Sequence, residues 1–335
     1  MTQSGKLAPV YSKMKELSKG PVVRREVIAD DDASQRVDNY LVRRCKGVPK
    51  SHLYRILRSG EVRVNGGRVG PDYRLQAGDE LRIPPLRVAK RPAVAVPRST
   101  RRFDVLYEDD ALIVLNKPAG VAVHGGSGIS FGVIEQLRQQ RPEARFLELA
   151  HRLDLETSGL LLVAKKRTAL AGLHAQLREG AILKTYMALV KGRWLDPRRQ
   201  IKLPLHKFLT PEGERRVCVS DSGKYAHSTV CLRARWSNFS LVDVELKTGR
   251  THQIRVHLAH LGYPLCGDDK YGDFALNKDL NRVGLKRMFL HAAHLVFCHP
   301  LTGTKIDVIA PLPEELQDFL SKLDIHEARD YGAPI

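Results

Sequence analysis

The sequence predicts an α+β protein with two domains, and three observations support that prediction. The chain has 335 residues, which is long enough to build two hydrophobic cores. Many short stretches alternate apolar and polar residues, as the strands of a half-buried sheet do, and a few stretches with helical spacing interrupt them. Residues 1–102 hold 23 Lys and Arg against 10 Asp and Glu, so the rest of the chain carries only +5 of the net +18. We therefore expect a small basic domain, followed by a larger one built on a mostly antiparallel, mixed β-sheet with flanking helices.

The domain boundaries follow changes in composition and periodicity. Weakly periodic, charged residues open the chain, and a basic stretch containing three prolines separates the domains. The predicted segments are a flexible N-terminal tail over 1–33, a basic domain over 34–84, a basic linker over 85–102, the larger domain over 103–324 and a C-terminal tail over 325–335.

The basic domain is expected to begin with two helices. Ser34 is a good N-cap for the first helix, whose apolar face repeats at Val37, Leu41 and Cys45. A Gly-Val-Pro break ends it, and a second helix follows until Gly60. The second helix turns three cations outward: Lys50, Arg55 and Arg58.

A small sheet is expected after these helices. Asn65-Gly66-Gly67 stands between two short apolar-basic runs, which is a hairpin signal. Residues 73–75 and 80–83 add a second strand pair around Gly78. Two basic helices followed by a small sheet resemble the S4 RNA-binding fold over about residues 35–84. That resemblance implies that Lys50, Arg55 and Arg58 contact RNA phosphates.

The larger domain reads as strands with interspersed helices. Strands are predicted at 105–107, 112–115, 160–164, 185–190, 227–235, 240–246, 289–298 and 305–309; helices at 129–140, 168–178, 251–261 and 313–323; and an excursion of loops or hairpins at 193–222.

The most unusual stretch of this domain is His151 to Gly159, directly before the buried strand. Asp154 and Arg152 flank a single leucine there, and a Thr-Ser-Gly turn follows. Loops held by a rigid strand are frequent sites of chemistry. The alternative interpretation is a structural carboxylate that caps the turn through backbone N–H groups.

Two further stretches favour a functional interpretation. Arg250, His252 and Arg255 cluster at the start of the predicted helix 251–261, where the helix dipole disfavours cations. An anion should compensate them, either Asp154 or a bound phosphate, unless Arg255 is a surface residue facing solvent. Tyr186 lies in an alternating strand, where a core role and a ligand-facing role are both open.

Several classes of protein are excluded. The five cysteines contain no C-x-x-C pair, and no P-loop or H-E-x-x-H pattern occurs. We therefore expect no metal, and hydrogen bonds or RNA contacts for a group of histidines: His252, His257, His260, His291 and His294. No signal peptide and no apolar run long enough for a bilayer is visible, so a cytoplasmic protein without membrane contact is expected.

Four stretches together resemble the RluA-type pseudouridine synthases over about residues 103–312: 151–159, 184–192, 248–257 and 267–272. The resemblance implies isomerisation of uridine to pseudouridine without a cofactor, by a monomeric enzyme. The S4-like front implies a 23S ribosomal RNA substrate, or its assembly precursor, modified at several positions. It further implies that Asp154 is the catalytic carboxylate, that Arg255 supports it and that Tyr186 stacks on the flipped base. The implied RNA-binding residues of this domain are His151, Arg152 and Arg250.

One departure and two alternatives accompany this resemblance. Leu155 stands where the family often has a cation after the aspartate, which affects RNA contacts rather than catalysis. An RNA-binding assembly protein with a silent catalytic domain is one alternative. A glycosidase is the other, and it needs a second carboxylate, for which the Asp154 loop offers only Glu156.

Overall fold

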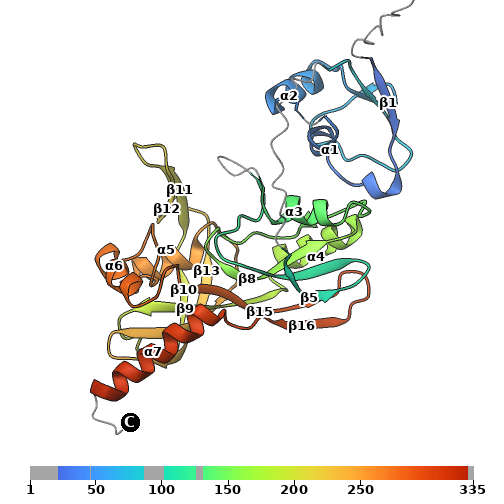
Figure 1. Ribbon diagram of the computed structural model, residues 1–335. Helices are drawn as coiled ribbons and strands as arrows, with labels where there is room; N and C mark the ends of the chain where they lie inside the picture. Colours follow the sequence, from blue (N-terminus) through green and yellow to red (C-terminus); the bar gives the residue numbers. More distant parts are fainter. Residues whose placement is uncertain (1–21, 46, 87–101, 126–130, 331–335) are drawn as a thin grey trace, which may run out of the picture. The chain divides into compact units, whose positions relative to one another are not determined.

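The computed structural model describes residues 22–45, 47–86, 102–125 and 131–330 (Figure 1). The start of the predicted N-terminal tail, the linker from 87 to 101, the glycine-rich residues 126–130 and the last five residues lie outside the described residues. The chain divides into two units, Met1–Val94 and Ala95–Ile335, and each is presented by itself.

The first unit is a four-stranded sheet with two helices around a single apolar core. Its elements are β1 (Arg24–Val27), η1 (Asp30–Asp32), α1 (Val37–Arg44), α2 (Lys50–Arg58), β2 (Arg63–Val64), β3 (Gly67–Arg68) and β4 (Glu80–Ile83), and the strand order is β1-β4-β2-β3. The hairpin prediction is confirmed, since Asn65 and Gly66 have φ angles of 49° and 78°, as a two-residue hairpin turn requires. Of the second predicted strand pair, only β4 forms a strand.

The N-terminal boundary of this unit corrects the prediction. Arg24–Val27 was assigned to the tail but forms β1, which pairs antiparallel with β4. The next residues enter the core, where Ile28 is 1% exposed. The strand is mostly exposed and charged, so its stability comes from hydrogen bonds to β4, which no local pattern reveals. Ser34 has a φ of 63°, and the N-cap of α1 is Arg36 instead.

The second unit contains the remaining elements. Its strands are β5 (Asp104–Glu108), β6 (Leu112–Lys117), β7 (Glu148–Leu149), β8 (Ser158–Ala164), β9 (Leu183–Lys191), β10 (Arg198–Lys202), β11 (Leu205–Leu209), β12 (Arg215–Val219), β13 (His227–Arg235), β14 (Phe239–Leu246), β15 (Leu290–Cys298) and β16 (Lys305–Ile309). Its helices are α3 (Val133–Gln140), α4 (Arg167–Glu179), α5 (Gln253–His260), α6 (Phe274–Arg282) and α7 (Glu314–Asp330).

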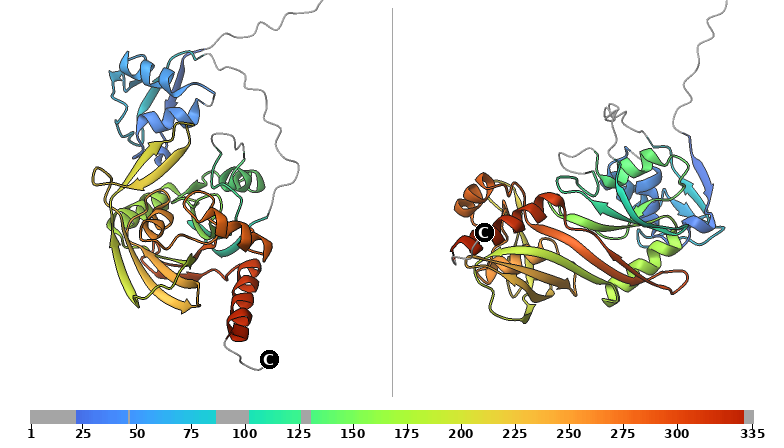
Figure 2. Two further views of the ribbon diagram at one scale, coloured as in Figure 1. Left: turned by 90° about the vertical axis from the view of Figure 1, so that its left-hand side faces the viewer. Right: turned by 60° about the horizontal axis from the view of Figure 1, so that its bottom comes forward.

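A ten-stranded mixed sheet forms the frame of this unit within the described residues. Its main path runs β10-β13-β14-β9-β15-β8-β6-β5, with β16 paired to β15 and β7 paired to β8. The β8–β15 pair is parallel and the other named pairs are antiparallel, so the predicted α+β class with a mostly antiparallel, mixed sheet is confirmed. The predicted excursion over 193–222 contains β10 of this sheet and the hairpin β11–β12, which projects from the rest of the unit (Figures 1 and 2).

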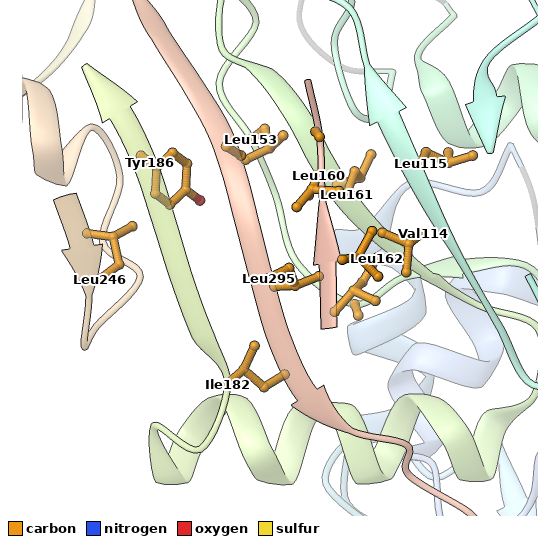
Figure 3. Close-up of a cluster of buried hydrophobic side chains, with 14 of the residues drawn as sticks. Val114, Leu115, Leu153, Leu160, Leu161, Leu162, Ile182, Tyr186, Leu246 and Leu295 are labelled. Carbon is orange, nitrogen blue, oxygen red and sulfur yellow. The ribbon is translucent and has the colours of Figure 1, made fainter. Parts of the chain in front are cut away.

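Both faces of the sheet are covered, and β9 shows how. Its residues Ala188 and Val190 belong to one apolar cluster, which includes side chains of α3, α4 and α5. The neighbouring Leu189 belongs to another cluster, which includes side chains of α6 and α7. Figure 3 shows part of the first cluster, in which Leu153 and Tyr186 lie with the apolar side chains of β8.

Two helices differ from the prediction. Helix α6 was missed because it is short and buries one residue, Leu280. Asp273 caps it by accepting hydrogen bonds from two backbone N–H groups. Helix α7 continues to Asp330, past the start of the predicted C-terminal tail at 325, which the sequence did not indicate because residues 326–330 are mostly polar or charged. In the described part of the chain, no helix is long and apolar enough to span a membrane.

The parallel contact between β8 and β15 depends on the glycine at position 159 and on a buried hydrogen bond between Ser158 and His291. Gly159 has a φ of 106°, and a Cβ there would lie 2.2 Å from the carbonyl oxygen of Ala292, so only glycine fits. Next to it, Nδ1 of the fully buried His291 lies 2.9 Å from the hydroxyl oxygen of Ser158, and Nε2 of that ring donates to the Ala310 carbonyl. Burial disfavours the charged ring and lowers its pKa, so His291 is neutral at pH 7.

The burial of His291 should make the protein less stable in acid. Burial lowers the pKa of His291 from 6.5 to about 4 in the folded protein. Between these values the unfolded chain binds a proton that the folded chain does not, so the free energy of unfolding falls as the pH falls, by up to about 3 kcal/mol. Urea unfolding at pH 7.5 and pH 4.5 should show a smaller acid loss for His291→Gln than for the unsubstituted protein. Equal losses would contradict this account.

Candidate active site

Asp154 lies on the loop that joins β7 to β8. The backbone N–H of Thr157 donates to the Asp154 carbonyl at 3.2 Å, which closes a tight turn directly before the buried strand. The carboxylate is 29% exposed and faces a cavity of about 1000 Å³. Tyr186 of β9, together with His252 and Arg255 from the start of α5, lines the same cavity. The structure therefore brings together three residues that lie far apart in the sequence and were predicted to share one site: Asp154, Tyr186 and Arg255.

Arg255 is held by an acidic pair that the sequence analysis did not assign. Its Nε and Nη2 donate to the two oxygens of Asp268 at 2.7 and 2.6 Å, and Nη2 also donates to Asp269 at 3.1 Å. The side chains of Arg255 and Asp268 are 5% and 1% exposed. Burial opposes charge on both, but their mutual hydrogen bonds raise the pKa of Arg255 and lower the pKa of Asp268.

The third nitrogen of this guanidinium faces Asp154. Nη1 of Arg255 lies 3.6 Å from Oδ2 of Asp154, so the predicted ion pair is present. It is longer than the bonds to Asp268, however, and the cations at the start of α5 are compensated mainly by Asp268. Asp268 also accepts from the backbone N–H groups of Lys270 and Tyr271. The fixed pair leaves the Asp154 carboxylate oriented but without a short hydrogen bond from Arg255.

His252 occupies an unusual backbone position beside Asp154. Its φ of 52° is in the left-handed region, which costs about 1–3 kcal/mol for a residue other than glycine. Its Nδ1 lies 2.9 Å from the hydroxyl oxygen of Tyr271, which also accepts a hydrogen bond from the Val217 N–H. Its Nε2 lies 4.0 Å from Oδ2 of Asp154. Burial lowers the pKa of His252, with the Asp154 charge opposing.

Tyr186 presents its ring to the cavity from β9. The side chain belongs to the apolar cluster in Figure 3 and is 7% exposed. Burial, together with the nearby charge of Asp154, raises the pKa of its hydroxyl. The residue is thus a neutral aromatic wall beside a carboxylate, and both interpretations left open by the sequence apply, since it belongs to the core and also faces the cavity.

Two buried cations support the Asp154 loop from the side away from the cavity. Nζ of the fully buried Lys117 donates to the carbonyls of Pro118, Val121 and Leu155 at 2.8 to 3.1 Å. Burial lowers the pKa of Lys117 to about 7. The three carbonyl acceptors match the three N–H groups of an ammonium and so favour the charged form.

Arg287 holds the next peptide of the same loop. Its Nη2 donates to the Glu156 carbonyl at 3.1 Å and to Oγ of Ser158 at 2.8 Å. Its Nη1 lies 3.2 Å from Glu315 of α7. The peptides that follow Asp154 are therefore fixed by side chains from β6 and from the segment before β15. The sequence did not predict this support, because Lys117 and Arg287 are remote from the loop in the chain.

The predicted RNA-binding residues have different environments. Arg152 is exposed at the cavity wall, and Arg250 lines the cavity while its Nε donates to the Tyr225 carbonyl at 2.9 Å. His151 has a structural bond, since its Nε2 accepts from the Leu162 N–H at 3.1 Å. Burial, followed by the charge of Lys184, lowers the pKa of His151 to about 4. In the first unit, α2 exposes all three predicted cations: Lys50, Arg55 and Arg58.

In the described part of the chain, no three His, Cys, Asp or Glu side chains lie close enough together to bind a metal ion. The two buried histidines of the predicted group form hydrogen bonds instead. His257 is fully buried, with Nδ1 3.0 Å from Oγ of Ser228 and Nε2 3.0 Å from the Leu203 carbonyl. His291 bonds Ser158 and Ala310.

Comparisons with known proteins agree with this geometry. Residues 111–260 match the family model of RNA pseudouridylate synthase, and residues 35–81 match that of the S4 domain. The chain is 52% identical over 310 residues to "Ribosomal large subunit pseudouridine synthase C" of Escherichia coli (strain K12), covering 90% of this chain and 97% of that protein. The protein of the same name from Pasteurella multocida (strain Pm70) is 50% identical over 306 residues, or 90% and 94% of the two chains.

A solved structure gives a similar result for the fold. "Human RNA Pseudouridylate Synthase Domain Containing 1" is 26% identical with a TM-score of 0.53, and the alignment covers 68% of this chain and 97% of that one.

The arrangement around Arg255 predicts unequal effects of two neighbouring carboxylates on stability. Asp268→Asn leaves a buried guanidinium without its charged partner, which should lower the free energy of unfolding by about 3–5 kcal/mol. Asp269→Asn removes the same charge from a side chain that is 72% exposed, so the loss should stay within about 1 kcal/mol. Urea unfolding of both variants measures the difference, and similar losses would show that Asp268 is not the principal anchor.

Proposed function

The chain belongs to the RluA-type pseudouridine synthases, and from that premise we propose that it isomerises uridine to pseudouridine in large-subunit (23S) ribosomal RNA, with Asp154 as the catalytic carboxylate. The observation that carries the proposal is the position of Asp154, which faces a cavity between Arg255 and Tyr186 in a chain with two relatives of this activity at 50–52% identity. The reaction breaks the C1′–N1 bond, turns the uracil and joins C1′ to C5. It has no net redox change and consumes no water, so these residues need no cofactor.

Asp154 supplies the charge that the reaction needs at C1′. A carboxylate there acts as a nucleophile or stabilises a cationic sugar, as it does in glycosidases. Arg255, whose Nη1 lies 3.6 Å from Oδ2 of Asp154, orients this carboxylate. Because Arg255 is already bound to Asp268, the carboxylate keeps free lone pairs to approach the sugar.

Tyr186 and Arg152 suit the handling of a flipped base. A base inside a stack is out of reach of a carboxylate on a loop, so the uridine must leave its helix. The buried ring of Tyr186 offers a stacking surface beside Asp154, and its neutral hydroxyl is available near C5, where a proton is lost. The exposed Arg152, two residues before Asp154, is placed to occupy the vacated position or to hold a phosphate.

The first unit supplies electrostatic binding to this activity. The S4 match covers residues 35–81, and three cations of α2 are exposed there. We propose that this unit holds RNA phosphates, giving affinity without sequence choice. A ribosomal RNA substrate, or its assembly precursor, implies that the enzyme acts in the cytoplasm, and the complete cavity within one chain is consistent with a monomer.

The two alternative functions are less well supported. A silent RNA-binding protein has no need for a carboxylate fixed between Arg255 and Tyr186 at the wall of a cavity. A glycosidase needs a second carboxylate across the reacting bond, but Glu156 does not line the cavity, and the two other acids of its wall are engaged, Glu135 by backbone N–H groups and Glu148 by Arg138.

Replacing Asp154 tests the proposal. Asp154→Asn keeps the size and removes the charge, so we expect folded protein that binds 23S ribosomal RNA and forms no pseudouridine. Pseudouridine mapping of RNA treated with the pure enzyme measures this. Glu156→Gln is the matched control, because it removes one charge from the same loop outside the cavity, and it should remain active. Substantial turnover by Asp154→Asn, or release of free uracil by the unsubstituted enzyme, would overturn the assignment.

A triple substitution tests the role of the first unit. Lys50→Gln/Arg55→Gln/Arg58→Gln removes three exposed cations, so fewer counterions are released on binding. The slope of log affinity against log salt should become shallower by about 0.7–0.9 for each lost contact. Binding titrations at several salt concentrations measure the slope. An unchanged slope would show that α2 does not contact RNA.

A further inference from the structure

Lys184 is a cavity residue to which no role has yet been given. It lies on β9 two residues before Tyr186, and side chains two apart on a strand point to the same face. Both residues line the cavity that contains Asp154. The Lys184 side chain runs through the protein interior, since the residue is only 8% exposed.

The ammonium of Lys184 has no protein partner among the described residues, and this distinguishes it from the other buried cations discussed above. Lys117 bonds three carbonyls, Arg255 bonds two carboxylates, and Arg287 bonds carbonyls and Glu315. No hydrogen bond or ion pair of the described part of the chain involves the side chain of Lys184, and Nζ is not among the side-chain atoms there that are both inaccessible to solvent and unpaired. The charge therefore opens onto the cavity.

A structural role does not explain this charge. Burying a cation without a partner destabilises a protein, and a methionine would fill the same space without that cost. Burial lowers the pKa of Lys184, and no neighbouring carboxylate opposes the effect. The buried ammonium of Lys184 is favourable only if an anion or a strong hydrogen-bond acceptor enters the cavity.

The surroundings of Lys184 indicate which acceptor fits. Asp154 forms ion pairs with Arg255 and His252 but none with Lys184, so Lys184 is separate from the carboxylate and from the C1′ chemistry. It lies instead near His151, whose pKa it helps to lower. The exposed Arg178 of α4 lines this cavity as well.

The remaining acids of the cavity wall are already engaged. Glu135 accepts from the N–H groups of Gly125 and Gly132, and Glu148 pairs with Arg138 at 3.0 Å. Neither forms an ion pair with Lys184, and the cavity lining holds seven Lys and Arg against three Asp and Glu. The cavity therefore has an uncompensated positive charge away from Asp154.

We propose that Lys184 binds a backbone phosphate of the RNA strand that carries the flipped uridine, and so holds the nucleotide while Asp154 reacts. This proposal rests on the proposed function. It assigns Lys184 a substrate-binding role that is separate from the chemical step, because a phosphate stays charged throughout the reaction and its binding contributes equally to the ground state and the transition state.

The experiment compares Lys184→Met with Lys191→Met. Lys191 ends the same strand, pairs with Asp273 at 2.6 Å and does not line the cavity, so the control removes the same charge elsewhere. Binding of transcribed 23S ribosomal RNA is measured in an Asp154→Asn background, in which no turnover interferes, and pseudouridine formation is measured with Asp154 intact.

Lys184→Met should weaken RNA binding about tenfold at moderate salt, since a hydrogen bond to a charged group is worth about 1.5–3 kcal/mol. The salt slope should become shallower by about 0.7–0.9. Turnover at saturating RNA should persist, while the KM rises. The melting temperature should stay the same or rise, which a structural lysine would not allow. Lys184→Arg should restore binding, and Lys191→Met should bind as the parent does.

Three outcomes would overturn the proposal. Unchanged binding and salt slope in Lys184→Met would show that no phosphate reaches this lysine. Lost turnover with unchanged binding would place Lys184 on the uracil, acting as negative charge develops on it. A lowered melting temperature together with weaker binding in both Lys184→Met and Lys184→Arg would give it a structural role. Absence of pseudouridine from the unsubstituted enzyme is a separate result, which would refute the proposed function and not the binding measurements.

Discussion

The arrangement of the candidate site depends on the buried ion pair between Arg255 and Asp268. A guanidinium at the start of α5 faces an unfavourable helix dipole and loses its water, and two short hydrogen bonds to a nearly inaccessible carboxylate offset both effects. Only one nitrogen is left to face Asp154, at 3.6 Å. The Asp154 carboxylate is thus oriented by a cation whose position does not depend on it. In the proposed reaction, this separation lets Asp154 approach a sugar without leaving Arg255 unpaired.

A second constraint acts on the backbone of the Asp154 loop. Lys117 and Arg287 donate to the consecutive carbonyls of Leu155 and Glu156, so the loop is held from β6 and from the segment before β15. Each donor comes from a part of the chain far from the loop. The pairing of β8 with β6 on one side and with β15 on the other brings those parts together. Positioning here is therefore a property of the sheet, and the loop contributes the proposed reactive group.

Positive charge serves different purposes in different parts of the molecule. Exposed cations, such as those of α2 in the first unit, suit phosphate contacts that carry affinity. The cations buried around the Asp154 loop are bonded to carbonyls or carboxylates, and they fix geometry. Lys184 differs from both groups. It is buried, as the cations around the Asp154 loop are, but its side chain has no partner among the described residues, which suits the binding of a ligand. Charge count alone does not separate these roles, whereas burial and partners do.

The sequence by itself determined the α+β class, the strands with clear alternation and the three stretches that meet at the cavity. Asp154 and Arg255 stood out because each breaks a local pattern, as a carboxylate before an apolar run and a cation at a helix start, and the resemblance to the pseudouridine synthases joined them with Tyr186 in one site. Strand β1 was missed because its stability comes from its pairing partner, and helix α6 because it is short and buries one residue. Only the tertiary structure decided that Asp268 anchors Arg255, because hydrogen bonds between distant segments exist only once the sheet has placed both ends within about 3 Å of each other.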